Sequence, residues 1–106
     1  MAALLLFTAA TAQTTGFNDN RIIAHRGAWK NTGHPQNSLA SFRAAAEMGC
    51  HGSECDVHLT SDDSLVVCHD LKHGGMLIET TPYAELAKMP LKNGETIPTL
   101  RQYIAR

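Results

Sequence analysis

The stretch from Gly52 to Leu59 constrains the fold most, because polar and apolar side chains alternate along it. Side chains of a β-strand point to opposite faces in turn, so a strand here places Glu54, Asp56 and His58 on one face. The opposite face then carries the apolar side chains Cys55, Val57 and Leu59, which predict packing against a core. Two neighbouring carboxylates are costly to bury unless a cation or hydrogen-bond donors compensate their charge. A divalent metal is one such cation.

Length and charge limit the class of protein. The chain has 106 residues, of which 43% are hydrophobic, enough for one small domain with a core. Its formal net charge is -1, and the sequence has no basic stretch of the kind that neutralises nucleic-acid phosphates. Aromatic residues make up only 6%, too few for base-stacking platforms. We therefore expect no nucleic-acid partner.

The first twelve residues differ in kind from the rest. Residues 2–10 are apolar and uncharged, and residues 10–12 (Ala-Thr-Ala) fit the pattern that precedes a signal-peptidase cut. We expect a signal peptide over residues 1–12, a cut before Gln13 and a secreted or periplasmic protein. The apolar run is too short to span a bilayer, so we expect no stable membrane span. Residues 13–20 are interpreted as a linker.

Strand and helix patterns alternate along the remaining chain. The runs at 21–25, 52–59 and 65–69 predict strands, and those at 39–48, 81–88 and 100–105 predict helices. The continuous apolar run at 21–25 is typical of a strand buried on both faces. Strand–helix–strand units favour parallel pairing with right-handed crossovers. We therefore expect an α/β fold built on a parallel sheet.

The helix over 39–48 has well-marked ends and one apolar face. Asn37 or Ser38 suits its N-cap, and Gly49 is expected to end it. Residues of its predicted apolar face recur at helical spacing: Leu39, Phe42, Ala45 and Ala46. This pattern predicts that the helix packs on the sheet.

Polar side chains gather in and after the three predicted strands. They are His25 and Arg26 after the first, Glu54 and Asp56 in the second, and His69 and Asp70 after the third. Because the carboxyl ends of parallel strands meet at one edge, we expect these side chains to converge there. Histidine exchanges protons near neutral pH, arginine binds phosphate oxygens, and paired carboxylates bind hard cations. The group is therefore the candidate site, although each residue alone also fits a structural or surface role.

Other polar and sulfur-containing residues are interpreted as structural. His51, His58 and His73 are assigned to the surface or to substrate loops. Cys55 and Cys68 lie in strand patterns and are expected to be small buried side chains, while a disulfide among Cys50, Cys55 and Cys68 stays open. Trp29 could stack on a choline-like cation and Lys72 could touch a leaving group, but a structural role is the preferred interpretation of both.

Five short segments recur in a known order. They are residues 24–27 (Ala-His-Arg-Gly), 35–42, 52–60, 66–70 and 97–100. Together, from Arg21 to the C-terminus, they resemble the glycerophosphodiester phosphodiesterase family. The resemblance implies a TIM barrel, the (β/α)₈ fold, of which residues 21–106 would form the N-terminal part. A complete barrel of this kind typically needs roughly 250 residues.

The resemblance also implies an activity, metal-dependent hydrolysis of glycerophosphodiesters to glycerol 3-phosphate and an alcohol. In the family, the histidines matching His25 and His69 act as the acid–base pair, and the arginine matching Arg26 contacts the phosphate. Positions matching Glu54 and Asp56 bind Mg²⁺ or Ca²⁺. The implied cofactor is thus a divalent metal, and the implied partner is a small-molecule diester; the oligomeric state is left open.

Two features depart from the family pattern. The family usually has Glu where this chain has Gln36, and we expect the lost charge to alter the basicity of His25. The family's third metal carboxylate comes from a later strand, which is expected beyond Arg106. Two alternatives stay open: a truncated or degenerate domain that binds phosphate ligands without catalysis, and a phospholipase D-like activity on larger lipids.

Overall fold

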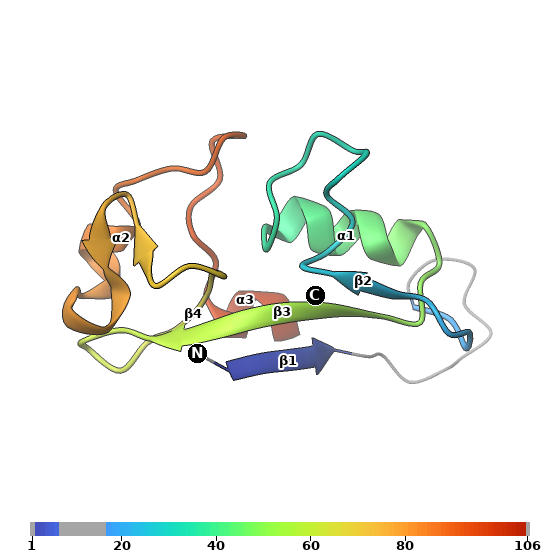
Figure 1. Cartoon of the computed structure of the whole chain (residues 1–106), viewed down its shortest axis with the longest axis horizontal. Coiled ribbons are helices and arrows are strands. Elements are labelled where there is room, and N and C mark those ends of the chain that lie inside the picture. The colour runs from blue at the N-terminus through green and yellow to red at the C-terminus, as the bar shows by residue number, and fades with distance from the viewer. Residues whose placement is uncertain (1, 7–16, 106) are drawn as a thin grey trace.

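Strand β3 (Gly52–Leu59) is the centre of the main sheet in the computed structural model, which describes residues 2–6 and 17–105 (Figure 1). Strand β2 (Ile23–His25) pairs in parallel with the first half of β3, so that His25 lies opposite Glu54. Strand β1 (Ala2–Leu6) pairs antiparallel with the other edge of β3. The predicted strand over 52–59 is confirmed with the same bounds.

Strand β4 (Leu65–Val67) returns along β3 as an antiparallel hairpin partner. The expectation of a third parallel strand is therefore wrong. Only residues 60–64 connect the two strands, whereas parallel pairing needs a crossover of a dozen residues or more. The reversal brings the chain after β4 back beside Asp56, whose carbonyl oxygen accepts the N–H of Cys68 at 2.9 Å.

Helix α1 (Leu39–Glu47) packs against β3 and confirms the predicted helix. Ser38 is its N-cap: the Ser38 hydroxyl accepts the N–H of Ser41 at 3.0 Å, and the Ser41 hydroxyl accepts the N–H of Ser38 at 3.2 Å. Two backbone donors of the first turn are satisfied in this reciprocal way. Gly49, with a φ of +76°, follows the last turn as expected for a helix end.

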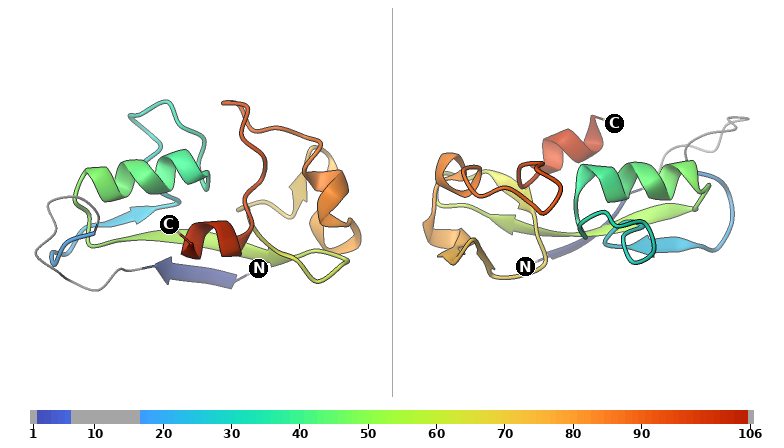
Figure 2. Two further views of the ribbon diagram at one scale, coloured as in Figure 1. Left: turned by 180° about the vertical axis from the view of Figure 1, so that it is seen from behind. Right: turned by 90° about the horizontal axis from the view of Figure 1, so that it is seen from above.

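Helix α3 (Leu100–Ile104) lies beside α1, and the two helices share an aromatic core (Figure 2). The ring of Tyr103 meets that of Phe42 edge-to-face at 4.8 Å, and Phe17 meets Phe42 in the same manner at 5.3 Å. The buried Tyr103 hydroxyl donates to the carbonyl oxygen of Ser38 at 3.0 Å. Phe17 belongs to the expected linker, so the described part of that segment is packed onto the core.

A second group of short elements covers the far end of the hairpin. It consists of the two-stranded ribbon of β5 (Lys72–His73) and β6 (Met76–Leu77), the 3-10 helix η1 (Ile78–Thr80) and α2 (Tyr83–Leu86). These elements enclose a smaller apolar cluster of Val66, Ile78, Leu86 and Ile97. Helix α2 is shorter than the predicted 81–88, and the carboxylate of Asp62 accepts its first N–H, from Tyr83, at 3.1 Å.

Three expectations about burial are wrong. Ile22 and Ile23 are 61% and 37% exposed, because within the described residues β2 pairs only with β3. Leu59 is 50% exposed at the end of β3. His58, assigned to the surface, is buried, and its Nε2 lies 3.3 Å from the carbonyl oxygen of His69. The hairpin explains this burial, since the chain after β4 returns over the face that carries His58.

The cysteines and the N-terminal segment give three further findings. Cys50 and Cys55 are buried, Cys68 is partly buried, and all three are free. In the described ranges, no helix has the length and hydropathy needed to cross a membrane. The expected signal-peptidase cut before Gln13 lies outside the described residues and stays a prediction.

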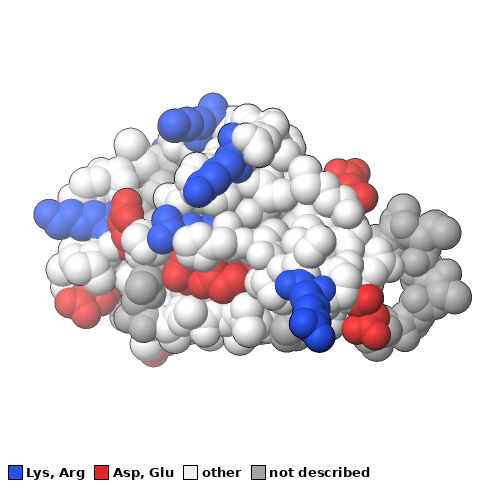
Figure 3. Space-filling model, turned by 45° about the vertical axis from the view of Figure 1, so that its right-hand side comes forward, with Lys and Arg blue, Asp and Glu red and all other residues white. Residues whose placement is uncertain are grey.

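Charged side chains of both signs are distributed over the surface. On the face in Figure 3, Lys and Arg side chains stand in small groups with Asp and Glu side chains between them. This distribution accords with the formal net charge of -1.

Candidate active site

The turn that ends β2 begins the candidate site. Arg26 has a φ of +58° and Gly27 a φ of +83°, so the chain turns through two left-handed residues directly after His25. The backbone N–H of Arg26 donates to Oε1 of Glu54 at 3.1 Å. A side chain at Gly27 would place its Cβ 2.3 Å from the hydroxyl oxygen of Ser41 on α1. Glycine is therefore required where the turn meets the helix.

The Arg26 side chain is held from two sides. Its Nη1 donates to Oε1 of Gln36 at 2.8 Å, and its Nε lies 3.6 Å from Oδ2 of Asp56. Its Nη2 makes no hydrogen bond within the described residues and can donate to a ligand, and its buried Nε likewise has no hydrogen bond there. Gln36 thus orients the arginine through an uncharged partner, while its expected effect on the basicity of His25 stays a prediction.

Asn37 holds Asp56 from the opposite side. Asn37 is 3% exposed and has a φ of +57°. Its Nδ2 donates to Oδ2 of Asp56 at 3.2 Å, and its Oδ1 accepts the backbone N–H of Asp56 at 3.4 Å. Its own N–H donates to the carbonyl oxygen of Arg26 at 2.8 Å. One buried residue therefore joins the arginine turn, through its backbone N–H, to the acidic face of β3, through its side chain.

The two predicted histidines take different places around this cluster. The side chain of His25 is 65% exposed, and its Nε2 lies 3.8 Å from Oε1 of Glu54. The side chain of His69 is 35% exposed, and its Nδ1 lies 2.9 Å from Oδ1 of Asp70. A carboxylate at Nδ1 favours the tautomer with the proton on that nitrogen, which leaves Nε2 as the acceptor. His25 thus lies directly beside Glu54 on the acidic face of β3, whereas the hairpin of β3 and β4 brings His69 close to that face.

The carboxylates present a pair of uncommitted oxygens. The chain bonds Oε1 of Glu54 and Oδ2 of Asp56, while the second oxygen of each has no hydrogen bond within the described residues. Over the same residues, no three His, Cys, Asp or Glu side chains lie close enough together to hold a metal ion. Mg²⁺ is commonly bound through one or two carboxylates, with waters and substrate phosphate completing its shell. The donors present fit that type of binding.

Cys55 is separated from the acidic face although it lies between its two residues in sequence. It points into the core beneath α1. Burial, together with the charges of Glu54 and Asp56, raises the pKa of the Cys55 thiol to about 12. The thiol therefore stays protonated near neutral pH and serves as neither nucleophile nor metal ligand.

A match to a family model gives the family of this chain. The model of the glycerophosphoryl diester phosphodiesterase family matches residues 25–106, a range that holds all of the residues described above. The chain belongs to the glycerophosphoryl diester phosphodiesterase family. This membership confirms the resemblance drawn from the five segments.

Relatives in this family are found in bacteria and in animals. A glycerophosphodiester phosphodiesterase of Caldanaerobacter subterraneus is 38% identical over 91 residues, covering 74% of this chain and 37% of the relative. The glycerophosphodiester phosphodiesterase 1 of Homo sapiens is 36% identical over 98 residues, covering 78% of this chain and 29% of the relative. The chain therefore spans roughly a third of the length of these curated relatives.

Solved structures of family members have the same arrangement of elements. A glycerophosphodiester phosphodiesterase from Parabacteroides distasonis superposes with a TM-score of 0.76 at 49% identity, covering 85% of this chain and 38% of that one. One from Thermotoga maritima gives a TM-score of 0.66 at 30% identity, covering 81% of this chain and 38% of that one. The mixed α/β fold is thus shared with these phosphodiesterases.

Within this family site, sequence reasoning missed the role of Asn37. The sequence offered it only as an alternative helix cap to Ser38, because both residue types favour that position. A usable signal was present: Asn tolerates the left-handed conformation better than most residues, so it also suits the position just before a cap. Its bond to Asp56 joins residues 19 positions apart, which no local pattern reveals.

Proposed function

We propose that the protein hydrolyses glycerophosphodiesters to glycerol 3-phosphate and an alcohol. Family membership supports this reaction class, and the names of the relatives point to the same substrate class. The observation that carries the proposal is the placement of Arg26: its backbone N–H bonds Glu54, its Nη1 bonds the neutral Gln36, and its Nη2 has no hydrogen bond within the described residues.

The proposal includes the fold that the family resemblance implies. In it, β2 and β3 are the first two parallel strands of a (β/α)₈ barrel, and α1 is the first helix of its outer ring. The parallel pairing of β2 with β3 and the packing of α1 on β3 support this assignment. In such barrels the chemistry lies at the carboxyl ends of the strands, which is where His25 and Arg26 stand.

Arg26 is proposed to bind the phosphodiester. A guanidinium presents N–H groups in a planar fork that matches two phosphate oxygens. Because Gln36 is neutral, it orients this fork without cancelling its charge. Asp56 lies on the Nε side, 3.6 Å away, and therefore leaves the outer nitrogen for the ligand.

The two histidines are proposed to move protons on either side of the phosphorus. One takes the proton of an attacking water or glycerol hydroxyl as the new P–O bond forms. The other gives a proton to the alcohol oxygen as the old P–O bond breaks, so that the alcohol leaves neutral. Asp70 at Nδ1 of His69 supports a free Nε2, and Oε1 of Glu54 lies 3.8 Å from Nε2 of His25.

A divalent metal fits the acidic face and completes the proposal. Members of the family generally depend on such a metal. Glu54 and Asp56 would hold it through their uncommitted oxygens, and it would supply positive charge for the negative charge that develops on phosphate. Asn37 and the Arg26 N–H keep the remaining carboxylate oxygens in place.

The test replaces His25 by Ala and Glu54 by Ala in the natural full-length protein. Loss of an acid–base group typically lowers the rate about 10²- to 10⁴-fold, and we expect a fall of that size in His25→Ala. We expect Glu54→Ala to lose most turnover as well, because the proposed metal would keep only one of its two carboxylates. Matched controls are His51→Ala, at the opposite end of β3 from the hairpin, and Glu79→Ala on the exposed surface of η1. Near-normal turnover by either site variant would refute the assignment, and binding without turnover in the parent protein would favour the degenerate phosphate-binding domain.

A further inference from the structure

A cavity of about 600 Å³ adjoins the candidate site on the side of His69. Gln36, Asn37 and His69 line it. Gln36 bonds Arg26, Asn37 bonds Asp56, and His69 follows Cys68, whose N–H bonds the carbonyl oxygen of Asp56. The cavity therefore shares Gln36 and Asn37 with the cluster around Arg26, although Arg26 itself is not among its lining residues. Its volume is typical of pockets for small molecules, so it has room for a group attached to a bound phosphate.

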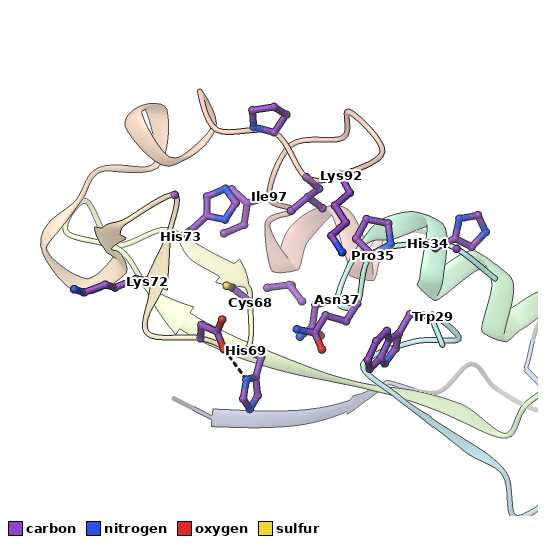
Figure 4. A pocket seen from close by; sticks show the side chains of 17 residues that line it. Trp29, His34, Pro35, Asn37, Cys68, His69, Lys72, His73, Lys92 and Ile97 are labelled. Atoms are coloured by element: carbon purple, nitrogen blue, oxygen red, sulfur yellow. Dashed lines mark hydrogen bonds and ion pairs between the residues drawn. The ribbon is translucent and has the colours of Figure 1, made fainter. Parts of the chain in front are cut away.

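Two exposed lysines line the cavity, Lys72 and Lys92, and in Figure 4 the Lys72 amine points away from Asn37. In Figure 4 the side chain of Lys92 runs toward Pro35 and Asn37, with its amine at the end nearest to them. Over the described residues, Lys92 takes part in no hydrogen bond or ion pair. The one acidic residue of the lining is Asp70, and its carboxylate already faces Nδ1 of His69. Acceptor groups of a ligand are therefore favoured here, and cationic groups are repelled.

The aromatic residue of the cavity is not arranged to receive a cation. The indole N–H of Trp29 donates to the carbonyl oxygen of His25 at 3.1 Å, which fixes the ring. The amine of Lys30 lies over that ring, 5.8 Å from its centroid. A quaternary ammonium held by Trp29 would compete with this lysine for the electron-rich face and would be repelled by its charge. The choline role considered for Trp29 is thus disfavoured.

We infer that this cavity receives the alcohol of the diester, and that this alcohol is a polyol without positive charge, of the glycerol or inositol type. The inference rests on the proposed function, because it extends the site that would bind the phosphate. Lys92 donates to the hydroxyl oxygens of the alcohol, and His73 stands on the far wall with its Nε2 already bonded to the carbonyl oxygen of Met89 at 2.7 Å. Because Lys92 repels the positive charge of choline and ethanolamine, their esters are poor substrates.

The experiment compares two diesters in the natural full-length protein, glycerophosphoinositol and glycerophosphocholine. We expect kcat/KM to favour the inositol ester by about tenfold, close to the repulsion of two unit charges separated by water, because Lys92 is exposed. The variant Lys92→Gln should bring this ratio down to within about threefold of unity. The variant Lys88→Gln, which removes an exposed lysine paired with Glu85 outside the cavity, should leave the ratio as in the parent protein.

The outcomes separate the two proposals. Hydrolysis of neither ester, nor of any other glycerophosphodiester, would overturn the proposed function itself. Hydrolysis that favours the choline ester, or a ratio that Lys92→Gln leaves unchanged, would overturn the inference while the proposed function stands. Thermal unfolding of the two lysine variants accompanies the kinetics, and equal midpoints assign any change in the ratio to the lost charge.

Discussion

Replacing Asn37 by Ala removes the side chain that holds Asp56 and keeps the backbone bond from residue 37 to Arg26. The lost contacts are the 3.2 Å bond from Nδ2 to Oδ2 of Asp56 and the longer 3.4 Å bond from the Asp56 N–H. Asp56 is itself buried, at 4% exposure. Water therefore has little access to replace the lost donor.

The cost follows from two separate terms. A hydrogen bond to a charged group contributes about 1.5–3 kcal/mol, and the 3.4 Å bond adds little to it. Alanine in a left-handed conformation costs about 1–2 kcal/mol, and the φ at this position is +57°. We therefore expect Asn37→Ala to lower the free energy of unfolding by about 3–4 kcal/mol, a large share of the 5–15 kcal/mol typical of a domain.

Urea unfolding of the parent protein, Asn37→Ala and Asn37→Gly separates the two terms. Glycine accepts the backbone conformation, so Asn37→Gly should lose only the hydrogen-bond term. Its free energy of unfolding should be about 1 kcal/mol higher than that of Asn37→Ala. The midpoints should shift with little change in slope. An alanine variant within 0.5 kcal/mol of the parent protein, a limit set by typical surface substitutions, would refute the idea that the amide holds Asp56.

Two further predictions concern the turns on either side of the sheet. Gly27→Ala should lower the free energy of unfolding, measured by urea titration, by about 2–4 kcal/mol, because overpacking against the Ser41 hydroxyl of α1 adds to the strain of a left-handed residue. Gly33→Ala is the control: its Cβ would meet open space, so it should lose only about 1–2 kcal/mol. The hydroxyl of Thr60 and the N–H of Tyr83 donate to Asp62 and lower its pKa. The ionised Asp62 therefore contributes stability that is complete above the unfolded-state pKa of about 3.9 and is lost as pH falls through the lower folded pKa. Asp62→Asn should accordingly flatten the acid limb of a curve of unfolding free energy against pH, and an unchanged limb would contradict this prediction.

Local patterns predicted the elements that depend on neighbours in sequence. The alternation at 52–59 determined β3, and the Ser38 cap with Gly49 determined the ends of α1. Thr99 caps α3 as its residue type predicts. In each case the physical cause lies within about four residues, so the sequence alone contains it.

Features that depend on distant contacts were missed. The direction of β4 follows from the short connection over 60–64, which the parallel-sheet hypothesis overlooked. The burial of His58 follows from that reversal, and the role of Asn37 follows from a contact 19 residues away. For the candidate site, residue types and strand positions identified the candidate residues. The hydrogen bonds and ion pairs between them become visible only in the folded chain.

The central position of β3 has a consequence for how this site tolerates insertions and deletions. His25 is aligned with Glu54 through one strand pairing, and the chain before His69 is aligned with Val57 through another. Both alignments are made to the same strand, so the loops over 28–34 and 87–96 can change length without altering these strand pairings. A single residue inserted within β3 would instead turn the following carboxylate to the core face. Length variation among relatives should therefore accumulate in those loops and be absent from the eight residues of β3.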